Sequence, residues 1–100
     1  MSTSSEARRI DDEIAEQVIT LPKHLHARPA GEVAQAAARL PQTSIELAAG
    51  GRRANARSVL AVMGLGAVTG TEVLVSAAGP GAAVAVYEIC RILAAPETED

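Results

Sequence analysis

Residues 25–30 read Leu25-His26-Ala27-Arg28-Pro29-Ala30, and this hexapeptide predicts both the start of a helix and a site for an anion. Proline is favoured at the first position of a helix, so Pro29 predicts that a helix begins here. His26 then lies at the mouth of that helix, where backbone N–H groups and the positive end of the helix dipole attract anions, phosphate above all. Arg28 adds a planar fork of donors that suits phosphate oxygens. Because a neutral imidazole is a nucleophile near pH 7, these residues favour a histidine that carries a phosphoryl group.

The charge of the chain is unevenly distributed along its 100 residues, whose net charge is −3. The segments before residue 14 and after residue 95 hold seven of the 12 acidic residues but only two of the nine basic ones. Most of the remaining basic residues lie in segments 23–28 and 52–57, and we expect them to form one positive patch around His26. Such a patch suits an acidic protein partner or a phosphate group. It does not favour nucleic acid, because no Lys/Arg run with interleaved aromatic residues is present.

The composition favours one soluble domain without a large cofactor. Hydrophobic residues make up 48% of the chain, but Tyr87 is the only aromatic one, so no deep aromatic-lined pocket is expected. The single cysteine, Cys90, excludes an internal disulfide framework and a multi-cysteine zinc site. No apolar run is long enough to span a membrane and the N-terminus lacks a signal-peptide core, so we expect a cytoplasmic monomer without membrane insertion. Residues 1–14 are interpreted as a mobile tail, 15–95 as the folded domain and 96–100 as an acidic C-terminal tail.

Hydrophobic periodicity predicts seven elements in the order βαββαβα. The expected strands are 17–21, 44–48, 52–56 and 71–77, and the expected helices are 28–40, 58–63 and 82–93. Ser58 is expected to be the N-cap of the second, short helix. This order of elements, with its hairpins, predicts an α+β fold in which helices cover one face of an antiparallel sheet.

Two separated motifs resemble HPr, the family of histidine-containing phosphocarrier proteins of the bacterial phosphoenolpyruvate-dependent sugar phosphotransferase system. The first is the hexapeptide around His26, which resembles the active-site sequence of the family. The second is Asn55-Ala56-Arg57-Ser58-Val59-Leu60-Ala61-Val62-Met63-Gly64-Leu65-Gly66, which resembles the helix that carries the regulatory serine of the family and the loop after it. Their spacing fits the family over roughly residues 16–94.

The resemblance implies an open-faced β-sandwich, in which a four-stranded antiparallel sheet carries three helices on one face. It also implies that His26 accepts phosphate on Nδ1 from enzyme I and passes it to EIIA components of sugar permeases, with Arg28 contacting the phosphate. The chain would then be a covalent carrier in a relay and not a self-sufficient enzyme, and it would need no cofactor or metal. By the same resemblance, Ser58 is a candidate regulatory phosphoserine. The partner-docking residues would be Arg57, Val59, Leu60, Met63 and Leu65.

One residue departs from the family pattern. The family usually has glycine directly before the Leu-His pair, and this chain has His24. Glycine permits backbone angles that histidine tolerates poorly, so we expect a reshaped loop around His24.

Two other interpretations remain open from the sequence. A regulatory paralogue of HPr, or one of a nitrogen-related branch, would keep His26 and Arg28 and differ in its partners. A small metal-binding module would use His24 and His26, although the sequence places no further His, Cys or carboxylate cluster close to them.

Overall fold

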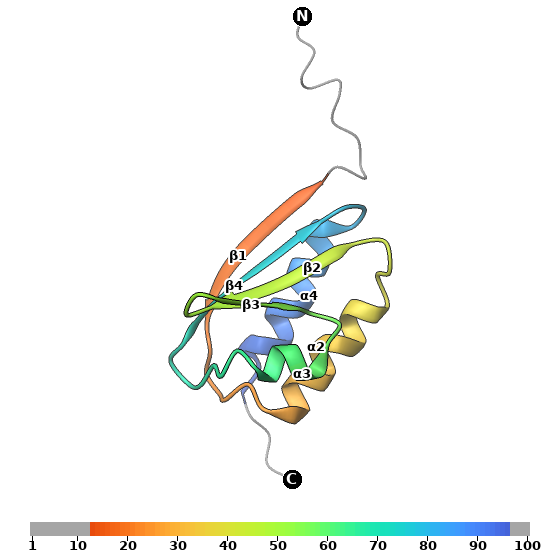
Figure 1. Ribbon diagram of the computed structural model, residues 1–100. Coiled ribbons are helices and arrows are strands. Elements are labelled where there is room, and N and C mark those ends of the chain that lie inside the picture. Colours follow the sequence, from red (N-terminus) through yellow and green to blue (C-terminus); the bar gives the residue numbers. More distant parts are fainter. Residues whose placement is uncertain (1–12, 97–100) are drawn as a thin grey trace, which may run out of the picture.

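The computed structural model of the chain describes residues 13–96 and shows four strands and three helices (Figure 1). The strands are β1 (Ile14–Thr20), β2 (Ser44–Ala49), β3 (Arg52–Asn55) and β4 (Glu72–Ala78), and the helices are α2 (Ala27–Ala38), α3 (Val59–Met63) and α4 (Ala82–Ala94). This is the βαββαβα order that the sequence predicts. Of the two predicted tails, residues 1–12 and 97–100 lie outside the described residues.

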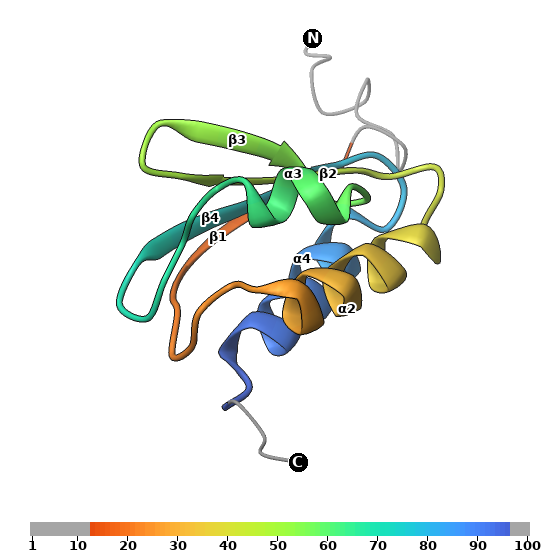
Figure 2. The same ribbon diagram turned by 60° about the horizontal axis from the view of Figure 1, so that its bottom comes forward.

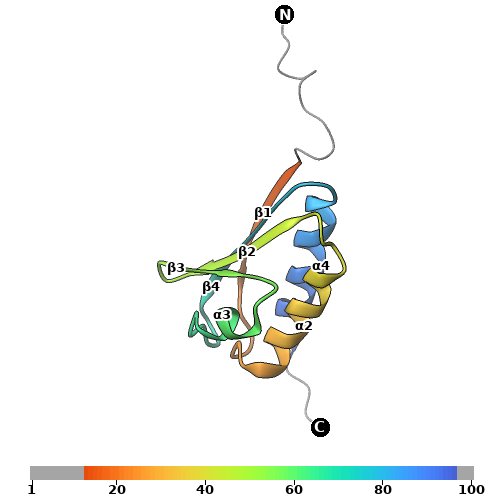
Figure 3. The ribbon, with the colours of Figure 1, turned by 45° about the vertical axis from the view of Figure 1, so that its right-hand side comes forward.

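The strands form one antiparallel sheet in the order β1-β4-β2-β3. Helix α4 packs against β1 and β4, α2 packs against α4, and α3 lies between α2 and β3. The helices therefore cover one face and leave the other face open (Figures 1 and 3). The predicted α+β open-faced β-sandwich is confirmed. Within residues 13–96 no helix is long and apolar enough to cross a membrane.

Alternating side chains assign the covered face of the sheet. Ile45 and Leu47 in β2 are buried, as are Val73 and Val75 in β4, while the residues between them are more exposed. The tight β2–β3 turn fixes this register, because Gly50 and Gly51 both adopt positive φ, +56° and +82°, as a two-residue hairpin requires.

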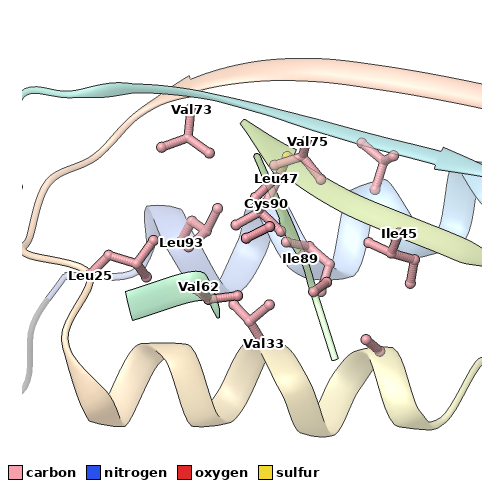
Figure 4. Packing of buried hydrophobic residues seen from close by; sticks show 14 of the residues in the cluster. Leu25, Val33, Ile45, Leu47, Val62, Val73, Val75, Ile89, Cys90 and Leu93 are labelled. Atoms are coloured by element: carbon pink, nitrogen blue, oxygen red, sulfur yellow. The ribbon is translucent and has the colours of Figure 1, made fainter. Parts of the chain in front are cut away.

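The core between sheet and helices contains alanine and aliphatic residues but no aromatic ring (Figure 4). Tyr87 points outward from α4 and is 62% exposed. Cys90 is buried, and burial raises the pKa of its thiol, so it behaves as a small core residue and not as a reactive one.

Two predicted boundaries were wrong in detail. Helix α2 begins at Ala27, so Pro29 occupies its third position and not its first. The fold tolerates this because none of the N–H groups in the first turn has an intrahelical partner, and the missing donor of proline costs nothing there. Strand β1 begins at Ile14, three residues earlier than predicted, because its edge position lets exposed side chains such as Glu16 and Val18 continue the pairing with β4.

The basic residues of the predicted patch do not all gather around His26, because several of them hydrogen-bond carbonyl groups at helix ends. Lys23 is buried and its Nζ donates to the carbonyl of Ile92, in the last turn of α4, at 2.8 Å. Arg57 donates to the carbonyls of Leu40 and Thr43, just beyond the end of α2. Helix C-termini attract cations, so these side chains act as tertiary caps.

We predict that Lys23→Met lowers the free energy of unfolding by about 1–3 kcal/mol, because it removes a charged donor and leaves a carbonyl of α4 without it. Denaturant unfolding measures the change. Arg91→Met is the matched control, since Arg91 lies in the same last turn but is exposed, and we expect a change within about 0.5 kcal/mol. Equal losses in the two variants would contradict a capping role for Lys23.

Candidate functional site

His26 is the N-cap residue of α2. Its backbone is extended, with φ −95° and ψ −161°, and its carbonyl accepts the N–H of Ala30 at 3.0 Å to open the 12-residue helix. Its side chain is exposed and makes no capping hydrogen bond to the helix. The first turn of α2 contains no acidic residue. The first-turn N–H groups and the helix dipole therefore favour an anion beside the imidazole.

Buried neighbours on both sides hold this exposed histidine in place. Leu25 is buried, and its N–H donates to the carbonyl of Ala67 at 3.0 Å. Pro29 and Ala30 are buried where α2 enters the core. The backbone of His26 is thus anchored before and after the residue while its side chain faces solvent.

Arg28 lies in the first turn of α2, two residues after His26, and is exposed. A guanidinium at this position can reach an anion held at the helix mouth and offer it two parallel donors. The imidazole of His26 and the guanidinium of Arg28 thus lie at the start of the same helix.

Ser58 directly precedes the short helix α3, as expected of its N-cap. The Oγ of Ser58 accepts the N–H of Ala61 at 3.1 Å, which makes Ser58 the N-cap. Of the candidate docking residues, Leu60 is 81% exposed, Met63 is exposed and Val59 is half-buried. The role of Ser58 as a phosphorylation site stays a prediction.

Two of the candidate docking residues do not present their side chains as the sequence suggests. Leu65 is only 7% exposed and belongs to the core, because the chain turns inward after α3. Arg57 turns toward the far end of α2, where it bonds the carbonyls of Leu40 and Thr43. Since α2 has 12 residues, about 18 Å of helix separates that end from His26.

The mouth of α2 and the exposed side of α3 share one end of the molecule (Figure 2). The two helices pack against each other there. Val68, in the loop after α3, is 48% exposed and adds to the apolar residues at this end, although the sequence did not single it out. Its signal in the sequence is weak, because a lone valine next to glycines and threonines resembles any loop residue. Exposed apolar residues therefore lie beside the exposed histidine, as in surfaces that bind other proteins.

His24 does not need the backbone angles of a glycine. Among residues 13–96, positive φ occurs only at glycines, so His24 fits the loop without backbone strain. Its Nδ1 accepts the N–H of Thr69 at 3.1 Å. In the same part of the chain, no three His, Cys, Asp or Glu side chains gather as a metal site would require.

Comparison with known proteins identifies the family. A family model for the phosphorylation site of the HPr component of the phosphotransferase system matches residues 15–95. The chain belongs to the HPr family. A search of curated proteins gives no match.

Solved structures of HPr proteins share the fold. A phosphocarrier protein HPr from Bacillus anthracis superposes with a TM-score of 0.75 at 24% identity, over 82% of this chain and 99% of that one. The histidine-containing phosphocarrier protein of Mycoplasma gives 0.68 at 31% identity, over 80% and 90%. HPr-C-His from Thermoanaerobacter tengcongensis gives 0.68 at 27% identity, over 81% and 90%. The family and the fold are those of phosphocarriers of the phosphotransferase system.

We predict that Ser58→Ala lowers the free energy of unfolding of this HPr domain by about 1 kcal/mol, because the first turn of α3 loses its cap. Ser58→Asp should unfold near the wild-type midpoint, since a carboxylate caps the same N–H and suits the helix dipole. Thermal unfolding of both variants measures the difference. If the aspartate variant is as unstable as the alanine variant, the hydroxyl of Ser58 has a role other than capping.

Proposed function

We propose that this HPr-family chain is a phosphocarrier in which His26 accepts a phosphoryl group from enzyme I and passes it to EIIA components for sugar uptake. Phosphoenolpyruvate is the ultimate donor. The observation that carries the proposal is the exposed imidazole of His26 at the N-cap of α2. Family membership over residues 15–95 supports it. A nitrogen-branch paralogue would use the same histidine and differ only in its partners.

The transfer step needs few protein groups. Nδ1 of His26 attacks phosphorus, the N–P bond forms, and the bond from phosphorus to the donor breaks, which leaves the electron pair on the donor. Phosphoryl transfer depends on positioning and on stabilisation of charge spread over the phosphoryl oxygens. The first-turn N–H groups of α2 and the guanidinium of Arg28 supply both.

An exposed site suits a carrier, because the same histidine has to fit a donor and then an acceptor. Leu60 and Met63 on α3 offer the partners an apolar contact area beside the mouth of α2. The protein would act as a cytoplasmic monomer, which would leave this end of the molecule open to each partner in turn.

We predict that His26→Ala abolishes phosphorylation by phosphoenolpyruvate and enzyme I, while His24→Ala keeps it. Phosphorus NMR of the wild-type protein should show one phosphoramidate signal, which is absent in His26→Ala. Matching circular dichroism spectra of the two variants would show that the fold is unaffected. A phosphoramidate signal that remains in His26→Ala, or one that is assigned to His24, would contradict the proposal.

Two neighbouring arginines in β3 test the electrostatic part of docking. Arg52 shares the helix-covered side of the sheet with buried Ala54, and its Nη1 donates to the carbonyl of Gly64 at the end of α3, at 3.0 Å. Arg53 pairs with Glu46 on the open face, at 3.8 Å. Only Arg52 therefore places its charge beside the candidate docking helix.

We predict that Arg52→Gln lowers the rate constant for transfer from enzyme I about threefold at low salt and flattens its dependence on ionic strength, because steering charge beside α3 is lost. Arg53→Gln should keep the wild-type salt dependence. Rapid-quench kinetics between about 20 and 300 mM salt, a range over which screening changes strongly, measures both variants. The reverse order of effects would place the docking surface on the open face.

A further inference from the structure

The segment that leads to His26 is joined to the loop after α3 at two points along the backbone. At the first, the N–H of Leu21 donates to Thr71 and the N–H of Gly70 donates back to Leu21, at 2.9 and 2.8 Å. At the second, the N–H of Leu25 donates to Ala67 at 3.0 Å. Pro22, Lys23 and His24 lie between these anchors and form the bend that turns the chain toward the helix.

The His24 side chain bridges the same two segments between the anchors. Its Nδ1 lies 3.1 Å from the backbone nitrogen of Thr69 and 3.4 Å from the Thr69 hydroxyl. A backbone amide can only donate, so Nδ1 must be the acceptor and carries no proton. The imidazole that makes this contact is therefore neutral, with its proton on Nε2.

The bridge ends on a turn that is closed by two hydrogen bonds. The N–H of Val68 donates to the Oγ1 of Thr71 at 3.1 Å, and the N–H of Thr71 donates to the carbonyl of Val68 at 2.9 Å. Thr69 lies inside this turn, so its N–H occupies a fixed place. A side chain bound there restrains the backbone two residues before the candidate phospho-acceptor His26.

We propose that His24 is a positioning residue for phosphoryl transfer, which holds the His26 loop against the turn at residues 68–71 so that the histidine and the apolar end of the molecule meet a partner together. This inference rests on the proposed function. The glycine that the family usually has here cannot make the bridge, because it has no side chain. In this chain, a side-chain hydrogen bond supplies the restraint.

The hydrogen bond of His24 sets the fraction of molecules whose His26 loop is in the conformation that binds a partner. The apparent affinity for a partner falls in proportion to that fraction. Once a partner is bound, it can hold the loop in the same conformation. Losing one hydrogen bond of this kind should therefore raise the KM of enzyme I for this chain about threefold to tenfold. The kcat of the transfer should stay within about twofold.

Two substitutions at position 24 separate the acceptor from the bulk of the side chain. Asparagine places a carbonyl oxygen at the same number of bonds from Cβ as Nδ1, so His24→Asn keeps an acceptor for Thr69. His24→Leu has the same branching at Cγ but no acceptor. We expect His24→Leu to raise the KM of enzyme I for this chain about threefold to tenfold. The KM for His24→Asn should stay within about twofold of the wild-type value.

Amide hydrogen exchange at Thr69 reports the bridge directly. Exchange should be faster in His24→Leu than in the wild type, and it should return toward the wild-type rate in His24→Asn. Thr69→Val is the control on the partner side, because it removes the hydroxyl and keeps the N–H, and it should leave KM unchanged.

The outcomes distinguish this inference from the proposed function. If all position-24 variants show the same KM and His26 is still phosphorylated, His24 does not position the loop and only this inference fails. The same holds if asparagine behaves like leucine. If His26→Ala still accepts the phosphoryl group, the proposed function itself fails.

Discussion

The close approach of α2 and α4 over the sheet is the constraint on which the rest of the structure depends. The helix faces that meet the core are largely alanine, with Ala30 and Ala37 on α2 and Ala82 and Ala85 on α4 fully buried. Because alanine extends only one carbon from the backbone, α2 and α4 lie near one another and α4 lies near β4. A larger residue at any of these positions would push α2 outward and take the mouth of that helix with it.

This packing explains why the long basic side chains lie where they do. Each of the three helices ends near a basic residue from another segment: α4 near Lys23, α3 near Arg52 and the end of α2 near Arg57. Neither α2 nor α3 has a basic residue in its own last turn, so the cations arrive through the tertiary fold. Charge that reads as one patch in the sequence is thus divided among three helix ends.

The sequence predicted those features that local patterns determine. Alternation identified the buried faces of β2 and β4, the Gly50-Gly51 pair identified the hairpin, and the hexapeptide identified the mouth of α2. The end points of long side chains were not predictable in this way. Lys23 reaches Ile92 across 69 positions of sequence and His24 reaches Thr69 across 45, so no local pattern records either contact.

The same distinction explains why Leu65, one of the candidate docking residues, is buried and not exposed. Leu65 follows α3 in the sequence, and the resemblance to the HPr family groups it with Leu60 and Met63 as a docking residue. In the fold, Leu60 is exposed on α3, whereas Leu65 follows Gly64 beyond the end of that helix and is buried in the core.

A buried Leu65 still matters to the surface, since it anchors the start of the loop that carries Val68 and Thr69. The buried side chain of that leucine holds the loop against the core. Hydrogen bonds to Leu25 and His24 hold it against the segment before α2. The exposed histidine of α2 and the exposed residues of α3 can therefore keep one arrangement while neither is itself packed. The proposed transfer site would thus stay open to successive partners, because the residues beneath and beside it hold its arrangement.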